Sequence, residues 1–322
     1  LFKSRLETVY NFRCIAFINL NFLLAYTVMK ILIAISSKEY SGPTLSAGMN
    51  ISHALNASTT IVDVGKKISE FSVKEVGMVN EMIESWDFDR PGVDVLEWAY
   101  SYLAENNFID PKSVKSGFPK NTLVETGSNR AEVYLKGALV ENLNLILRNG
   151  DIITELRDEV QTGKYDVTII GGSRKRNMAH DLIQYIDSSI FVAKKFDPKK
   201  DYRVLLAVDD SPGTKKAVKF GVRVAQAFNI PLDLLTISKK DNFGEGYKQA
   251  AARAAKLMRR SGIEAKNVFK VGNPVKTIVE EAGNDHIIIM GASTRSPITK
   301  FFKGSKPLNV MESCDCPILI VK

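Results

Sequence analysis

Cysteine is scarce in this sequence, which has three cysteines among its 322 residues. An odd, small number without repeated spacing excludes a disulfide framework and favours a reducing compartment, so we expect a cytoplasmic protein. Cys314 and Cys316 stand beside the apolar C-terminal run 318–321, and Cys14 stands alone. Buried small hydrophobic residues are therefore favoured over redox or metal chemistry at Cys314 and Cys316.

Recognisable catalytic patterns are also missing. The three histidines fall in unrelated positions without metal-ligand spacing, and no serine lies in a G-x-S-x-G elbow. The order of a P-loop, G-x-x-x-x-G-K-[ST], is absent as well, which argues against efficient ATP hydrolysis. We therefore predict no catalytic and no metal-ligating residue.

Long apolar runs are absent except near the N-terminus. Residues 14–28 are largely apolar but short for a membrane span, which needs about 20 residues. The sequence begins with Leu1, and Met29 directly precedes the apolar run 31–35. We expect Met29 to be the natural start and residues 1–28 to be an extra leader. A signal peptide or membrane anchor is the alternative, and we expect no membrane contact unless residues 1–28 are retained.

The positive charge is confined to one half of the chain. The net charge is +8, and residues 201–322 hold 20 basic and 12 acidic residues, so the first 200 residues are neutral. An anionic ligand, a nucleic-acid surface or a solvated lysine-rich surface would each explain this excess. We expect the anionic ligand and no nucleic acid.

The second half alternates apolar runs with amphipathic segments, which predicts a doubly wound α/β sheet. The expected strands are 203–208, 232–237, 267–271, 287–290 and 318–321. Four helices are expected between these strands. The first ends near Phe228, the second spans 247–260, the third begins at Asn273-Pro274 and the fourth spans about 305–313.

The first half repeats this pattern in a divergent form. Runs at 31–35, 60–64, 145–147, 165–170 and 190–193 occupy the corresponding places. We therefore expect two doubly wound, five-stranded parallel sheets, in domains 29–196 and 202–322. The charged segment 194–201, which contains a proline, is the expected linker.

The first domain carries an insert at about 66–143, which is longer than a crossover helix needs. It contains both tryptophans, Trp86 and Trp98, and an expected amphipathic helix over 93–106. The tryptophans either pack the insert against the sheet or form part of a protein-binding surface.

A loop from Gly291 to Ser305 follows the strand at 287–290 and leads into a helix. Backbone N–H groups and a helix N-terminus would converge there, an arrangement that holds phosphate. Four cations lie in or beside the loop: Arg295, Lys300, Lys303 and Lys306.

On these residues, the second half resembles the universal stress protein family. Nucleotide-binding members carry a glycine, two residues, a glycine, nine residues and then Gly-Ser. Gly291, Thr294, Gly304 and Ser305 match this spacing, with Thr294 in place of the middle glycine. The closing Cys-Pro-aliphatic strand is matched from Cys316 onwards. The match covers 202–322, and two copies resemble the family's tandem form, in which one chain makes a pseudo-dimer through the fifth strands.

The resemblance implies the adenine-nucleotide alpha-hydrolase-like fold and a regulatory protein that binds ATP or a related adenine nucleotide, with magnesium or manganese on the phosphates. Gly291, Thr294, Gly304 and Ser305 would lie against the phosphates, Ile237 against adenine and Asp209 against the nucleoside. From the residues alone, the position of Asp209 before Ser211 and Pro212 also suits a helix N-cap. The alternatives are a stress-related interaction module that binds no nucleotide, and a slow ATPase. A homodimer of the pseudo-dimer is also compatible.

The first copy lacks the features of this site. Ser36-Ser37 stands where the aspartate is expected, and Gly171 has no Gly-Ser partner downstream. The triplet 174–176, Arg-Lys-Arg, suits an anion or a solvated surface. The sequence thus predicts one intact site, in the second copy.

Overall fold

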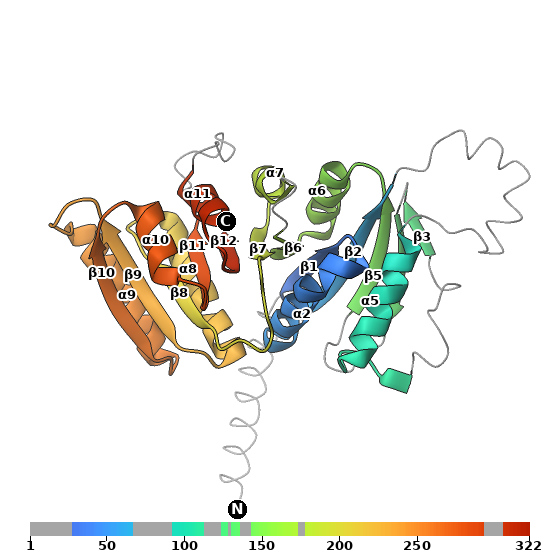
Figure 1. The fold of residues 1–322 in the computed structure, drawn as a ribbon, viewed down its shortest axis with the longest axis horizontal. Helices are drawn as coiled ribbons and strands as arrows, with labels where there is room; N and C mark the ends of the chain where they lie inside the picture. Colours follow the sequence, from blue (N-terminus) through green and yellow to red (C-terminus); the bar gives the residue numbers. More distant parts are fainter. Residues whose placement is uncertain are drawn as a thin grey trace, which may run out of the picture.

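The computed structural model describes residues 28–66, 92–112, 124–127, 130–135, 143–172, 178–292 and 305–322. Within these ranges, all strands join one 12-stranded sheet, in the order β10-β9-β8-β11-β12-β7-β6-β1-β2-β5-β4-β3 (Figure 1). The expected parallel α/β architecture is confirmed. The two expected sheets are continuous, because the fifth strands of the two halves pair with each other, as the resemblance to the tandem form implies.

The C-terminal half contributes five parallel strands, whose apolar residues are largely buried except in the edge strand β10. They are β8 (Arg203–Ala207), β9 (Leu232–Ser238), β10 (Ala265–Val271), β11 (His286–Gly291) and β12 (Ile318–Val321).

The N-terminal half contributes seven strands: β1 (Lys30–Ile35), β2 (Ser58–Gly65), β3 (Val124–Gly127), β4 (Arg130–Leu135), β5 (Leu143–Asn149), β6 (Val167–Gly171) and β7 (Ser189–Ala193). The antiparallel β3–β4 pair lies beside β5, at one edge of the sheet. The other five strands of this half, β5-β2-β1-β6-β7, have the same order as β10-β9-β8-β11-β12 of the C-terminal half: third, second, first, fourth and fifth along the chain. The β3–β4 pair belongs to the insert that the length of 66–143 predicted.

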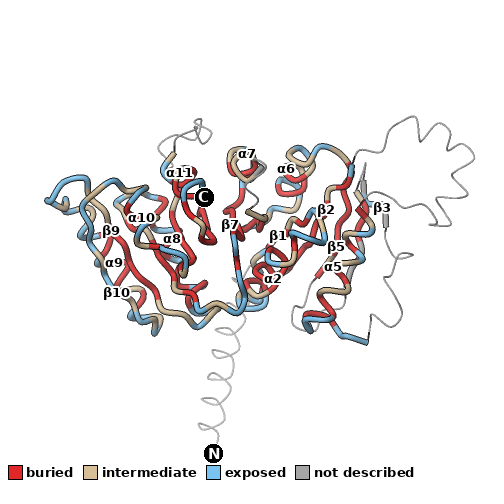
Figure 2. The backbone as a smooth tube through the Cα atoms, in the orientation of Figure 1, coloured by how far each residue is buried: buried red, intermediate tan, exposed pale blue. Residues whose placement is uncertain are grey.

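Helices cover both faces of the sheet, and each face has its own core. One core is formed under α2 (Lys38–Ala54), α5 (Val93–Glu105), α8 (Pro212–Phe228) and α9 (Glu245–Arg260). The other lies under α6 (Ile152–Gly163), α7 (Met178–Tyr185), α10 (Pro274–Ala282) and α11 (Lys306–Ser313). Buried residues line the strands and the inner helix faces in both halves (Figure 2).

The two halves are joined by antiparallel pairing of β7 with β12, in which Phe191 lies opposite Leu319. The segment expected to be a linker packs against this junction. Lys194 is buried and donates from Nζ to the carbonyl oxygens of Met311 (3.0 Å) and Cys314. Phe196 stacks on Tyr202 with 5.4 Å between ring centroids. The linker is therefore part of the fold.

The single-residue expectations have mixed outcomes. Cys314 and Cys316 are buried free thiols, as expected. Trp98 is half-buried against the core, 5.5 Å from the ring of Tyr102, which fits the packing interpretation. Trp86, Cys14 and the leader 1–27 lie outside the described residues. No helix in the described ranges has the length and apolar character to cross a bilayer.

A buried ionic cluster holds the insert's β4 to the body of the first half. Glu159 of α6 accepts hydrogen bonds from Arg130 Nε (2.9 Å), Arg148 Nε (2.8 Å) and the Tyr165 hydroxyl (3.1 Å). Burial acts to raise the pKa of Glu159, but the two arginines hold it below its ordinary value. Charged residues that look like a solvated surface in the sequence thus pair inside the protein.

Asp63 of β2 is a second buried carboxyl, and it predicts a pH effect on stability. Burial, reinforced by the charge of Asp94, raises its pKa from 3.8 to about 7. Between about pH 4 and pH 7 the folded state keeps a proton that the unfolded state has lost, so we expect this group to lower stability as the pH rises across that window. Chemical denaturation of the wild type and Asp63→Asn from pH 4 to pH 8 measures this effect, because the free energy of unfolding of the variant should not fall with pH in this way. Asp94→Asn should make the fall smaller. Equal pH profiles for the wild type and Asp63→Asn would contradict the raised pKa of Asp63.

Candidate functional site

A pocket of about 630 Å³ opens at the carboxyl ends of β8, β9 and β11. β8 lies between β9 and β11, where the strand order changes direction, and ligands of doubly wound sheets bind at such points. Residues from the first turn of each of α8, α9, α10 and α11 also line the pocket: Thr214, Tyr247, Pro274 and Lys306. The starts of four helices thus lie at its wall, and a helix N-terminus favours an anion.

Asp209 follows β8 and is fixed by the residues that begin α8. Its Oδ1 accepts hydrogen bonds from the Ser211 N–H (3.0 Å), the Ser211 hydroxyl (2.5 Å) and the Thr214 hydroxyl (2.6 Å). Burial acts to raise the pKa of Asp209, but these hydrogen bonds, together with the charge of Lys306, hold it below 3.8. Asp209 is therefore an ionised, oriented acceptor on the pocket wall.

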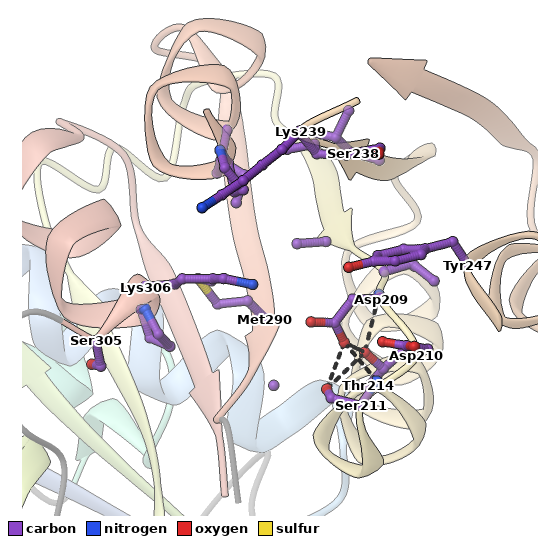
Figure 3. Close-up of a pocket in the computed structure, with 18 of the residues that line it drawn as sticks. Asp209, Asp210, Ser211, Thr214, Ser238, Lys239, Tyr247, Met290, Ser305 and Lys306 are labelled. Carbon is purple, nitrogen blue, oxygen red and sulfur yellow. Dashed lines mark hydrogen bonds between the residues drawn. The ribbon is translucent and has the colours of Figure 1, made fainter. Parts of the chain in front are cut away.

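The two sides of the pocket differ in charge. Asp209, Asp210 and Tyr247 lie on one side, and Ser305 and Lys306 lie on the other, across Met290 (Figure 3). Lys239 and Lys240, after β9, add two more cations to the lining. The pocket can thus take a ligand with hydrogen-bond donors at one end and negative charge at the other.

Gly291 ends β11 at a point where two stretches of backbone meet. A Cβ added there would lie 2.4 Å from the carbonyl carbon of Gly213 and 2.9 Å from the Thr214 nitrogen. A Cβ at Gly213 would lie 2.4 Å from the Ala292 oxygen. Both positions need glycine, because the N-terminus of α8 rests directly on the end of β11.

Ser305 is the N-cap residue of α11, and Lys306 is the first residue of that helix. The hydroxyl oxygen of Ser305 is buried and has no hydrogen-bond partner in the part of the chain that the structure describes. Buried polar atoms are nearly always paired, so this hydroxyl, beside a lysine at a helix N-terminus, fits an acceptor supplied by a ligand.

Four of the six residues expected at the site line the pocket: Asp209, Ile237, Gly291 and Ser305. Thr294 and Gly304, with the cations Arg295, Lys300 and Lys303, lie outside the described residues. The explanation of Asp209 as an N-cap was wrong, because Ser211 is the N-cap residue of α8 and Asp209 accepts hydrogen bonds from it instead.

Other lining residues were not predicted, among them Thr214, Lys239, Lys240, Asn242 and Tyr247. Ser211 and Thr214 had a signal in the sequence, since a serine two residues after an aspartate is typical of an Asx-turn. The residues after β9 had no such signal, because only the fold brings 239–247 to this edge.

The corresponding region of the first half is built differently. Ser37 caps α2 and accepts from the Tyr40 N–H at 3.4 Å, and the Ser41 hydroxyl accepts from the N–H groups of Ser36 and Ser37. Serine hydroxyls thus occupy the place of Asp209 and bond locally. The triplet 174–176 lies outside the described residues.

The described residues that line the pocket include no histidine. The described ranges contain no group of three His, Cys, Asp or Glu side chains placed to hold a metal ion. His286 does not line the pocket. It is buried between Asp285 Oδ1 (2.8 Å from Nδ1) and Asp233 Oδ2 (3.3 Å from Nε2), which gives it a structural role.

Comparison with known proteins agrees with the pocket-bearing half. Residues 202–322 match the sequence model of the universal stress protein family. A universal stress protein of Mycobacterium tuberculosis (strain H37Rv) is 24% identical, over 38% of this chain and 49% of its own length. The chain therefore spans about half the length of the curated relatives it matches.

Two solved structures show how far the likeness extends. A universal stress protein from Archaeoglobus fulgidus DSM 4304 covers 91% of this chain and 96% of its own, at 16% identity and a TM-score of 0.57. A second, from Archaeoglobus fulgidus in complex with dAMP, covers 38% of this chain and 98% of its own, at 19% identity and a TM-score of 0.31. The first supports the same fold along nearly the whole chain.

Proposed function

We propose that the universal stress protein domain at residues 202–322 binds ATP or a related adenine nucleotide in the pocket at β8, β9 and β11, and that the protein is regulatory. The observation that carries this proposal is the buried, unpartnered Ser305 hydroxyl beside Lys306 at the start of α11. A phosphate oxygen would accept from that hydroxyl and lie against the positive end of the helix.

The opposite end of the pocket suits a nucleoside. Asp209 is ionised, and its Oδ1 is held by three hydrogen bonds, which directs the carboxylate as an acceptor for ribose hydroxyls. Ile237 and Met290 add apolar surface for a base. Magnesium or manganese would arrive with the phosphates, since the described residues hold no ready-made metal site.

We also propose that the two halves are tandem copies, of which the second alone keeps the site. The shared strand order and the β7–β12 junction support this. In this view the protein works as a cytoplasmic pseudo-dimer, and the insert between β2 and β5 contributes a surface for a protein partner.

The proposal predicts that ATP raises the melting temperature of the full chain, with or without magnesium, in step with ligand concentration, because binding to the folded state alone stabilises it. Lys306→Gln and Ser305→Ala should each weaken ATP binding about tenfold, the equivalent of about 1.4 kcal/mol, since each removes a phosphate partner. Isothermal titration of ATP gives these affinities.

Lys199→Gln is the matched control, because Lys199 is an exposed cation in the segment before β8, at the end of that strand opposite to the pocket. It removes the same charge and should leave the affinity unchanged. No thermal shift at millimolar ATP would favour an interaction module that binds no nucleotide. Phosphate release that Asp209→Ala abolishes would instead indicate a slow ATPase.

A further inference from the structure

The exposed charged residues of α8 and α9 are cations with one exception, Glu245. Lys216 donates from Nζ to the carbonyl oxygen of Lys322 (3.2 Å). We call the surface formed by the other eight cations the basic face: Lys215, Lys219, Arg223, Lys248, Arg253, Lys256, Arg259 and Arg260. The two helices pack side by side on the same side of the sheet. α8 contains no acidic residue, and α9 contains one, Glu245, at its start. Much of the excess charge of the second half is therefore gathered on this surface.

The cations are regularly spaced. Lys215, Lys219 and Arg223 follow one another at intervals of four residues, so they form a stripe along α8 with about 6 Å between neighbours. Lys256 and Arg260 repeat this interval on α9. The basic face is thus an ordered array of charges carried by two rigid helices.

Within the protein, this array has no electrostatic compensation. None of the eight cations pairs with a carboxylate in the described residues, whereas Lys270 and Lys276, on the other face of the sheet, pair with Glu281 and Glu280. Like charges four residues apart destabilise a helix, and Lys215 in the first turn of α8 opposes the helix dipole. A bound polyanion would offset these costs to folding.

We propose that the basic face binds the phosphate backbone of a nucleic-acid duplex without reading its sequence. This goes beyond the nucleotide pocket, and it reverses the expectation from sequence that no nucleic acid is bound. Half of the eight cations are arginines, whose planar fork suits phosphate. Base-independent binding of this kind needs only such an array of cations.

A membrane surface fits less well. Amphipathic helices that bind bilayers present large apolar side chains beside their cations, and no large hydrophobic residue is exposed on α8 or α9. A duplex needs contact only with the cations of these two helices.

The test is fluorescence anisotropy of a labelled, random-sequence DNA duplex, titrated with the full chain at several salt concentrations. We expect the logarithm of the association constant to fall linearly with the logarithm of the salt concentration. The variant Lys219→Gln/Arg223→Gln/Lys256→Gln/Arg260→Gln should make that slope shallower by about 3 to 4, at about 0.9 for each lost phosphate contact. Its ATP affinity should be unchanged, so failure here is distinct from failure of the nucleotide proposal.

The control variant Lys164→Gln/Lys199→Gln/Lys270→Gln/Lys276→Gln removes the same net charge away from the basic face. It should keep the wild-type slope. The proposal would be overturned if both variants made the salt slope shallower by the same amount, or if the full chain did not bind the duplex at low salt. Tighter binding to phosphatidylserine vesicles than to the duplex would also overturn it and would point to a membrane partner.

Discussion

Replacing Glu159 by glutamine is expected to lower the free energy of unfolding by about 3 kcal/mol, because it breaks a buried ion pair and leaves charge behind. The Glu159 side chain is 2% exposed and is shared between Arg130 and Arg148. Removing its charge leaves each guanidinium group inside the protein with one carboxylate partner, Glu132 for Arg130 and Glu155 for Arg148. Urea denaturation of the wild type and the variant at neutral pH measures this difference.

Asp158→Asn is the matched control, since Asp158 is the neighbouring residue of α6 and pairs with Arg157 while 47% exposed. Exposed pairs contribute little, so this change should cost less than about 1 kcal/mol. If the two variants lost similar amounts of unfolding free energy, the buried cluster would stabilise the protein no more than an exposed ion pair does.

The Glu159 cluster also predicts an acid-sensitive contribution to stability. The pKa of Glu159 in the folded protein lies below its ordinary value of 4.5. The ionised carboxylate therefore contributes its full stabilisation at pH values above the pKa of the unfolded state, and this stabilisation is lost as the pH falls through the pKa of the folded state. The stability difference between wild type and Glu159→Gln should therefore shrink below about pH 4.5. Asp63 acts in the opposite sense between about pH 4 and pH 7, so the two groups can be separated by pH.

Gly291→Ala is expected to cost at least about 2 kcal/mol and to weaken nucleotide binding, although it adds a single methyl group. That methyl would lie 2.4 Å from backbone carbon and 2.6 Å from backbone oxygen of Gly213, and backbone cannot rotate away as a side chain can. The start of α8 must move, and Ser211 and Thr214 move with it. Asp209 would lose its orientation. Gly213→Ala should act in the same direction, since its Cβ meets the Ala292 oxygen.

Gly42→Ala provides the comparison for Gly291→Ala. Gly42 lies within α2, and a Cβ there meets only a Tyr102 ring carbon, at 3.9 Å. An alanine in a helix is favoured over glycine by up to about 1 kcal/mol, but a Cβ on the residue before Pro43 crowds the proline ring, so this variant should change stability much less than Gly291→Ala does. Chemical denaturation and ATP titration of the three variants separate backbone collision from the general effect of losing a glycine. Normal stability and ATP affinity in Gly291→Ala would contradict the close contact.

Much of the C-terminal half could be predicted from sequence because its signals are local. Runs such as 203–207 and 287–290 are too apolar to lie anywhere but in a buried parallel strand, and Asn273-Pro274 marks a helix start by its own chemistry. Pocket residues that follow directly from strands, such as Asp209 and Gly291, were found for the same reason.

The rest depends on contacts between residues that are distant in sequence. Arg130 and Glu159 are separated by 29 positions, and no local pattern distinguishes them from solvated charges. The requirement for glycine at 291 comes from Gly213 on another element. The basic face likewise needs two helices placed side by side before scattered lysines and arginines become one surface.

The antiparallel contact of β7 with β12 has a consequence for how the protein responds to dilution. The two halves are tied by a short connection, so each sees the other at a fixed, high effective concentration, and no loss of translational freedom opposes their association. Dilution cannot separate these two strands, whereas it can separate the strands of two different subunits. The midpoint of unfolding should therefore be independent of protein concentration.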